Sequence, residues 1–125
     1  MNKKILIVED ERLVAEDLKS TVSGFRYDVV GIVSSGKEAI ALAEQLKPDL
    51  ILMDIMLEGS MTGVEAAKII YDKQQTPIIF LTAYADEETL EGAIESDPYA
   101  YLIKPFRDRD LKITLKMAFN LINKK

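Results

Sequence analysis

Five short apolar runs, each followed by a segment with helical features, constrain the fold of this chain more than any other property. The runs are residues 4–8, 28–33, 49–53, 77–82 and 100–103. Three of them are apolar nearly throughout, as is typical of strands buried on both faces of a parallel sheet. Short connections and right-handed crossovers between such units give a doubly wound α/β sandwich. The alternation therefore predicts a single (βα)5 domain over residues 1–125, with helices on both faces of the sheet.

The segments between the runs carry signals for the starts of helices. Ser35 with Glu38, and Thr62 with Glu65, have the spacing of a capping box, in which a side chain at each end bonds the other's backbone. The fourth helical segment, residues 86–97, has few strong apolar residues and a glycine near its centre. We therefore expect this helix to be the easiest one to displace.

The last helix is predicted to have two apolar stripes. One has the spacing of a face packed on the core and consists of Leu111, Leu115, Ala118 and Ile122. The other lies about 120° around the helix by its residue spacing and consists of Ile113, Met117 and Leu121. The second stripe either borders the core or contacts a partner or a second copy of the chain.

The composition removes several classes of function. The chain has no cysteine and no histidine, which excludes disulfides, zinc sites built on Cys or His, and Ser-His-Asp catalysis. A net charge of −5 argues against direct binding of nucleic acid by this domain. Only five apolar positions precede the first acidic residues, too few for a signal peptide or a membrane span. We expect a cytoplasmic domain that binds neither nucleic acid nor membrane.

Polar and charged residues stand where four of the predicted strands end. They are Glu9 and Asp10 after the first strand, Asp54 after the third, Thr82 at the end of the fourth and Lys104 after the fifth. Taken singly, they have ordinary explanations, such as a helix cap for Asp10, a turn for Asp54 or a solvated charge for Lys104. However, ligands of doubly wound sheets bind outside the carboxyl ends of the strands, so we expect these side chains to share one site.

The chemistry of such a site follows from its charges. Three carboxylates, those of Glu9, Asp10 and Asp54, repel one another unless a cation lies between them. Oxygen ligands without His or Cys favour Mg²⁺. Lys104 and the Thr82 hydroxyl would complete a pocket suited to the negative charge of a phosphoryl group. A carboxylate in that pocket can itself be the nucleophile, giving an aspartyl phosphate.

Four segments at the strand ends together carry a resemblance to a known family. They are residues 5–11, 49–57, 77–85 and 100–106, and they contain an acidic pair, one Asp, Thr-Ala and Lys-Pro in that order. The combination resembles the receiver domain of two-component response regulators, including the chemotaxis regulators, and it extends over the whole chain. The resemblance implies a flavodoxin-like fold with the strand order 2-1-3-4-5 and a function in phosphorelay signal transduction.

Residue by residue, the resemblance implies that Asp54 accepts a phosphoryl group from a sensor histidine kinase or a phosphotransfer protein. Asp10 and Asp54 would ligate Mg²⁺ directly, together with the backbone carbonyl of Met56. Glu9 would act through a metal-bound water. Although Glu9 stands where the family often has Asp, we expect little change in metal binding.

The resemblance also implies how the signal leaves the site. Lys104 would pair first with Asp54 and then with the phosphoryl group, and its bond to Pro105 is expected to be cis. Thr82 would move to bond the phosphoryl group, and Tyr101 would swing inward in response. The face formed by the fourth helix, the fifth strand and the last helix would then pass the signal on, and could form a homodimer.

Two departures from the family pattern lie after Asp54. Glu58 stands where many members have Pro, and Gly63 falls one residue later than is usual, so we expect an extended, mobile loop over residues 57–63. Met56 and Tyr84 occupy the two positions that flank the path of attacking water in this family. Because both are bulky, we predict slow self-dephosphorylation.

Three other functions compete with this one. A Mg²⁺-dependent aspartyl-phosphate phosphatase of the haloacid-dehalogenase type needs a second Asp two residues after the nucleophile, where Met56 stands. A flavin carrier of similar fold needs a phosphate-binding loop after the first strand, where this chain is acidic. A receiver that only binds partners, without regulation by phosphorylation, has no need of the complete set of residues. We therefore expect a phospho-accepting switch rather than an enzyme.

Overall fold

The computed structural model of this chain describes residues 2–57, 59–82, 91 and 100–123. Glu58, Tyr84 and all but one residue of the predicted fourth helix lie outside the described residues. Three predictions therefore involve residues outside the described ones. They concern Glu58 in the extended loop, Tyr84 beside the path of attacking water, and the ease of displacing the fourth helix.

Five parallel strands form one sheet in the order β2-β1-β3-β4-β5. They are β1 (Lys4–Val8), β2 (Asp28–Val33), β3 (Leu50–Asp54), β4 (Ile78–Thr82) and β5 (Ala100–Ile103). Each predicted strand is confirmed to within one residue at either end. Because β3 and β4 end at Asp54 and Thr82, two of the predicted site residues are the last residues of neighbouring strands.

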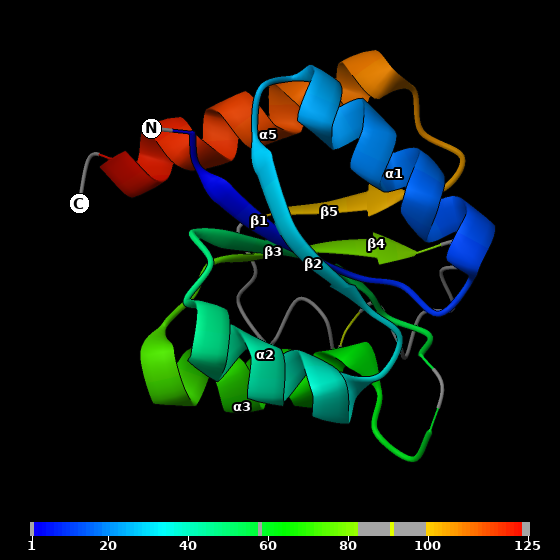
Figure 1. The fold of residues 1–125 in the computed structure, drawn as a ribbon, viewed down its shortest axis with the longest axis vertical. Coiled ribbons are helices and arrows are strands. Elements are labelled where there is room, and N and C mark those ends of the chain that lie inside the picture. The colour runs from blue at the N-terminus through cyan, green and yellow to red at the C-terminus, as the bar shows by residue number, and fades with distance from the viewer. Residues whose placement is uncertain (1, 58, 83–90, 92–99, 124–125) are drawn as a thin grey trace.

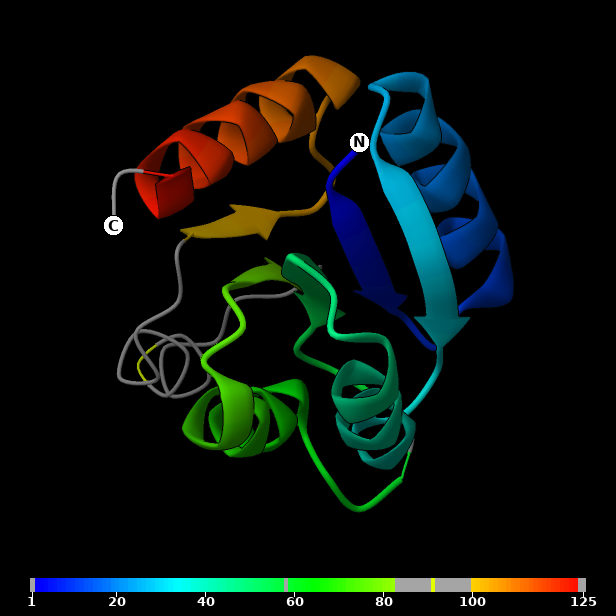
Figure 2. The ribbon, with the colours of Figure 1, turned by 60° about the vertical axis from the view of Figure 1, so that its left-hand side comes forward.

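Four helices of the described chain cover both faces of the sheet. They are α1 (Arg12–Gly24), α2 (Gly36–Leu46), α3 (Gly63–Gln74) and α5 (Asp108–Asn123). Figures 1 and 2 show α1 and α5 on one face and α2 and α3 on the other. The flavodoxin-like, doubly wound α/β architecture with the order 2-1-3-4-5 is therefore confirmed. None of these helices is both long and apolar enough to cross a membrane.

Both predicted helix starts are present. The Ser35 side chain accepts the backbone N–H of Glu38 at 3.2 Å. Thr62 and Glu65 form a complete capping box, with reciprocal bonds of 3.1 and 3.0 Å between the side chain of one residue and the backbone N–H of the other. Such caps satisfy N–H groups that the first turn of a helix otherwise leaves without partners.

Successive side chains of each central strand enter opposite halves of the core. In β1, Leu6 and Val8 pack on the side of α2 and α3, whereas Ile5 and Ile7 pack on the side of α1 and α5. The strand β3 follows the same rule, with Ile51 and Met53 in the first half and Leu50 and Leu52 in the second. This period of two, which is inherent in a β-strand, also decides on which side the residues after each strand emerge.

The last helix packs as predicted, and its second stripe faces outward. Leu111, Leu115 and Ala118 are buried, together with Phe119, and Ile122 is partly buried beside them. The second stripe is exposed to different degrees, with 45% for Ile113, 61% for Met117 and 50% for Leu121. These exposed fractions favour a contact surface over a border of the core as the interpretation of the second stripe.

Candidate phosphoryl-acceptor site

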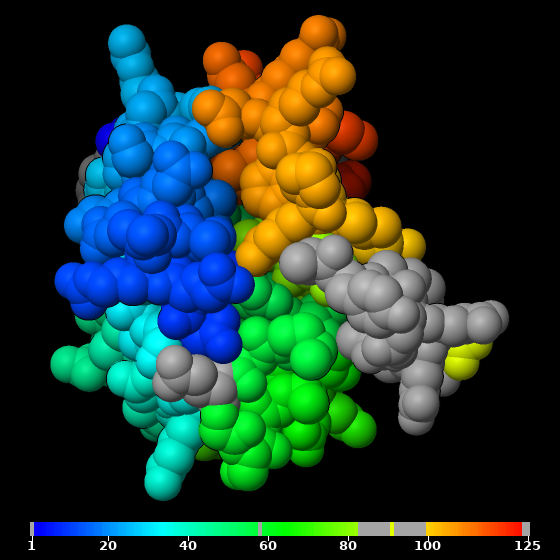
Figure 3. Space-filling model, turned by 90° about the vertical axis from the view of Figure 1, so that its right-hand side faces the viewer, coloured from blue at the N-terminus to red at the C-terminus, as the bar shows by residue number. Residues whose placement is uncertain are grey.

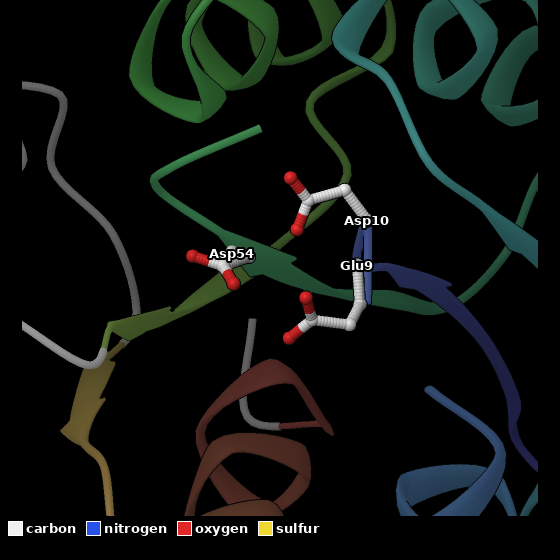
Figure 4. Close-up of side chains that lie close together, drawn as sticks. All are labelled: Glu9, Asp10 and Asp54. Carbon is white, nitrogen blue, oxygen red and sulfur yellow. The ribbon is translucent and has the colours of Figure 1, made fainter. Parts of the chain in front are cut away.

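The residues predicted at the strand ends come together at one edge of the sheet. Figure 3 looks onto this edge, where the segment after β1 (blue), the loop after β3 (green) and the segment after β5 (yellow to orange) meet. Carboxylate oxygens of Glu9, Asp10 and Asp54 lie within 4.8 Å of one another. Figure 4 shows the three side chains, with Asp54 at the end of β3 and the other two on the segment that follows β1.

Backbone hydrogen bonds hold these residues in place by continuing the sheet beyond its strands. The N–H of Glu9 donates to the carbonyl of Val33 at 2.9 Å, and that of Ile55 to Leu81 at 3.1 Å. The N–H of Lys104 donates to the carbonyl of Thr82 at 2.6 Å. Glu9, Lys104 and the residue after Asp54 are thus each bonded to a neighbouring strand, which gives the site a rigid base.

The Lys104 ammonium bridges two carboxylates. Its Nζ lies 3.1 Å from Oδ2 of Asp54, and only 2.6 Å from Oε1 of Glu9. The exposed fractions are 0% for the Glu9 side chain, 9% for that of Asp54 and 19% for that of Lys104. The structure thus places Lys104 against Asp54 as the resemblance implied, but the shorter contact, with Glu9, was not predicted. The Lys104–Pro105 bond is cis, as expected.

The second oxygen of each of these carboxylates accepts a backbone N–H. Oε2 of Glu9 accepts from Glu11 at 3.1 Å, and Oδ1 of Asp54 accepts from Met56 at 3.0 Å. These bonds are local, because each donor stands two residues after its acceptor, and they fix the orientation of both carboxylates. Met56 itself is 62% exposed at the rim of the site.

The environment shifts the pKa values of the Asp54 and Glu9 carboxylates in opposite directions. Burial raises the pKa of Asp54 to about 6, and the negative charge of Glu9 contributes to the rise, although the Met56 N–H opposes it. Burial also acts to raise the pKa of Glu9, but its bonds with Lys104 and the Glu11 N–H outweigh burial and lower that pKa below its usual value. Glu9 is therefore the stronger acid of the pair and the better partner for a cation.

Lys104 remains charged in spite of its position. Burial acts to lower the pKa of the Lys104 ammonium, but the bonds with Glu9 and Asp54 outweigh burial and raise that pKa above its usual value. The site therefore combines a Lys104 ammonium that stays positively charged with an Asp54 carboxylate whose negative charge is only partly stabilised by its neighbours.

The longer loop after Asp54 still returns to the acceptor strand. Gly63 donates its N–H to the carbonyl of Ile55 at 2.9 Å. A Cβ at Gly63 would lie 2.1 Å from the carbonyl oxygen of Asp54, far inside van der Waals contact. Only glycine allows this approach, so Gly63 lets the start of α3 lie directly against the backbone of Asp54. Its displacement by one residue along the sequence is absorbed by the loop, in which Gly59 has a φ of +90°.

The two predicted switch residues lie on neighbouring strands. Thr82 is fully buried at the end of β4, and Tyr101 of β5 is 40% exposed. Tyr101 pairs in register with Phe80, two residues before Thr82. The movement of the two side chains stays a prediction.

The donor atoms of the site fit Mg²⁺. Carboxylate oxygens of Asp10 and Asp54 lie close enough to hold one ion, and an oxygen of Glu9 lies within 4.8 Å of both. Hard oxygen donors without nitrogen or sulfur are the ligand set that Mg²⁺ prefers, and it needs only one or two carboxylates with water completing its shell.

Comparison with known proteins gives one family. The family model for the response regulator receiver domain matches residues 5–116. The transcriptional regulatory protein PdtaR of Mycobacterium tuberculosis is 38% identical over 116 residues, which cover 93% of this chain and 56% of that protein. The transcriptional regulatory protein YdfI of Bacillus subtilis is 39% identical, with coverage of 92% and 54%. The chain therefore spans about half the length of these relatives.

Solved structures agree with the sequence relatives. The signal receiver domain of a modulated diguanylate cyclase from Desulfovibrio desulfuricans has a TM-score of 0.90 at 39% identity, covering 96% of this chain and 95% of that one. A CheY-like receiver domain protein from Methanospirillum hungatei has a TM-score of 0.92 at 27% identity, covering 99% and 98%. On the fold, the strand-end residues and these matches, the chain belongs to the family of response regulator receiver domains.

Proposed function

We propose that Asp54 is the phosphoryl acceptor of this receiver, and that residues 1–125 act as one receiver domain. Membership in the family gives a role in phosphorylation-dependent two-component signalling. The observation that carries the assignment is that, of the two carboxylates in contact with Lys104, that of Asp54 keeps an exposed fraction of 9% whereas that of Glu9 is fully buried. A donor can therefore reach Asp54 beside an ammonium that is placed where charge develops during transfer.

In the proposed reaction, a carboxylate oxygen of Asp54 attacks the phosphorus of a donor. The bond between phosphorus and the donor nitrogen breaks, and the nitrogen keeps the electron pair. Asp54 must be charged to attack, and with a pKa of about 6 it is mostly charged at neutral pH. The ammonium of Lys104 lies close enough to neutralise part of the charge on the phosphoryl oxygens. The donor is proposed to be a sensor histidine kinase or a phosphotransfer protein.

Asp10, Asp54 and the backbone carbonyl of Met56 are proposed to hold Mg²⁺, with Glu9 acting through water. When bound, the ion would supply positive charge opposite both the carboxylates and the phosphoryl oxygens. The proximity of the carboxylate oxygens supports this ligand set. This ligand set is tested by titrating the protein with Mg²⁺ alone in a calorimeter. We expect Asp10→Asn to lose most of the affinity for Mg²⁺.

The proposed output uses Thr82 and Tyr101 as the switch, and the face that includes β5 and α5 as the contact surface. The exposed stripe of Ile113, Met117 and Leu121 supports this surface, since large apolar side chains gathered on one helix favour association. A homodimer through this face is part of the proposal. The expected cytoplasmic location stays a prediction.

The proposal makes the chain a slow switch rather than an enzyme with turnover. Met56 supports a long-lived phosphoryl group, since its exposed side chain at the rim of the site can obstruct the approach of water. Decay of the acyl phosphate is expected to be faster in Met56→Asn, where a polar side chain replaces the apolar one. Fast decay that does not change in this variant would contradict the proposed role of Met56.

The proposed function is tested by incubating the protein with a small phosphodonor and Mg²⁺ and then measuring its mass by intact-protein mass spectrometry. We expect the mass of one phosphoryl group on the wild type and none on Asp54→Asn. No gain of mass in the wild type, or a gain that survives in Asp54→Asn, would refute the proposal.

A further inference from the structure

Glu9, Asp54 and Lys104 emerge on the same side of the sheet. Val8 and Met53 pack toward α2 and α3, so Glu9 and Asp54, one residue further on, point toward α1 and α5. Leu102 packs on the α1 and α5 side, so Lys104, two residues later, returns to that side. Figure 4 agrees, because the carboxylate of Glu9 points toward α5 and that of Asp10 points the opposite way.

The contacts of Glu9 are those of an anchor for Lys104. Its Oε1 accepts from the ammonium at 2.6 Å, which is shorter than the 3.1 Å between Lys104 and Asp54. Its Oε2 accepts the N–H of Glu11 at 3.1 Å, so the carboxylate cannot turn without losing a bond. The side chain is fully buried, and a charge-assisted bond is strongest away from water.

We propose that Glu9 is a positioning residue that holds the Lys104 ammonium beside the acceptor whatever the state of Asp54. The inference rests on the proposed function and extends it. During transfer, one oxygen of Asp54 bonds to phosphorus and the carboxylate loses its charge, which weakens its contact with Lys104. The contact with Glu9 requires no such change, and it keeps the ammonium preorganised for the phosphoryl oxygens.

The length of the side chain matters to this role. Aspartate at position 9 would keep the charge but withdraw the carboxylate by roughly one C–C bond, about 1.5 Å. A contact that measures 2.6 Å would then exceed hydrogen-bonding distance. Glu9→Asp is thus a variant that retains the acid and breaks the anchor, and Glu9→Gln is one that retains the length and removes the charge.

The first test observes the Lys104 ammonium itself, by ¹⁵N NMR of the metal-free chain. The matched variants are Glu9→Gln and Asp54→Asn, since each replaces one of the two partners by its amide. We expect the slowly exchanging, ordered ammonium signal of the wild type to persist in Asp54→Asn and to vanish in Glu9→Gln. Persistence in Glu9→Gln, or loss in Asp54→Asn, would overturn the proposal.

The second test separates an anchor from a metal residue. With Glu9→Asp, we expect phosphorylation by a small phosphodonor at saturating Mg²⁺ to slow by roughly 10- to 100-fold, because a reacting group is displaced. A group that orients a metal ligand instead costs about 10- to 100-fold in metal affinity. An affinity loss of that size in calorimetry, with a normal rate at saturating Mg²⁺, would overturn the proposal.

The two tests also separate this inference from the function on which it rests. If the wild type accepts no phosphoryl group, the proposed function fails, yet the ammonium signal still decides whether Glu9 anchors Lys104. Backbone amide spectra of each variant establish that it is folded. If Glu9→Gln does not fold, Glu9→Asp takes its place in the first test, with the same expected loss of the ordered signal.

Discussion

The acceptor edge of the sheet and the outer face of α5 are built in opposite ways. At the edge, Glu9, Asp54 and Lys104 are buried and bonded to one another and to the backbone of adjacent strands. On α5, Ile113 and Met117 are about half exposed or more. Under the proposed function, the sheet fixes the groups that perform the chemistry, whereas the exposed face of α5 is available for recognition. Substitutions at the edge should therefore affect phosphorylation and folding, and those on the helix face only association.

The largest effect is expected from Lys104→Ala. Loss of a preorganised cation at a reacting group should slow phosphorylation by roughly 100-fold or more. Two buried carboxylates would also be left without their shared partner, at a cost of about 3 kcal/mol in the free energy of unfolding. Lys116→Ala, at an exposed position of α5, is the control and should change neither quantity. Intact-protein mass spectrometry over time measures the rate of phosphorylation, and urea denaturation measures the free energy of unfolding. An unchanged rate of phosphorylation in Lys104→Ala would contradict the role given to Lys104 at this edge.

The next effect is expected at the contact between α3 and the acceptor strand. Gly63→Ala places a Cβ against the Asp54 backbone and should destabilise the fold by about 3 kcal/mol. Gly24→Ala is the matched control, because a Cβ there meets no atom within 4 Å. We expect it to be neutral or to stabilise α1 by roughly 0.5 kcal/mol. Equal stability of both variants in urea denaturation would show that the approach of Gly63 is not required.

A smaller effect is expected from the charge of Asp54 as the pH changes. Its raised pKa means that the folded chain binds the proton of Asp54 more tightly than the unfolded chain does. Stability is therefore lost as the pH rises from near the usual 3.8 to about 6. The variant Asp54→Asn does not titrate, so its advantage over the wild type should grow by about 2 to 3 kcal/mol across this range. Urea denaturation in EDTA measures it, and an advantage that does not grow would contradict the raised pKa.

The smallest effect on the fold is expected on the face of α5. Met117→Ser should change the free energy of unfolding by less than about 0.5 kcal/mol, because the side chain is 61% exposed. Leu115→Ala, two residues earlier and fully buried, should cost about 3 kcal/mol. If phosphorylation produces a dimer through this face, Met117→Ser weakens it in analytical ultracentrifugation and leaves phosphorylation unchanged. Slow phosphorylation of Met117→Ser would show that the outer face of α5 and the edge of the sheet do not act independently.

Much of this organisation is predictable from the sequence for physical reasons. Continuous apolar runs specify strands buried on both faces, and the Ser35 and Thr62 caps specify where helices begin. Parallel strands bring their carboxyl ends to one edge, which is why Asp54 and Lys104 could be placed together from sequence alone.

Other features depend on geometry that the pattern does not contain. Along α1, Val14 and Thr21 have helical spacing with Leu18, but the buried residues are Ala15, Leu18 and Val22. Both sets have helical spacing and contain apolar residues, so packing on the sheet decides between them. The approach of Gly63 to Asp54 depends on the path of the loop between them, for which the sequence offers only the presence of a glycine.

The pairing of Glu9 with Lys104 was missed for a different reason. The resemblance implies only a role at the metal for Glu9, and its pairing with Lys104 follows instead from the alternation of side chains beyond the ends of the strands. That alternation places Glu9, Asp54 and Lys104 on one side, so the signal was present in the sequence. The extra methylene of Glu9, which we expected to matter little for metal binding, brings its carboxylate to Lys104.

The identity of the phosphorylated residue is the most direct measurement of the central claim. Reduction of the acyl phosphate with borohydride converts the modified aspartate to homoserine, which peptide mass spectrometry can locate. The account predicts homoserine at position 54 alone after treatment with a small phosphodonor and Mg²⁺. Homoserine at Asp10, reduction of Glu9 to its alcohol, or conversion of any other acidic residue in place of Asp54 would contradict it.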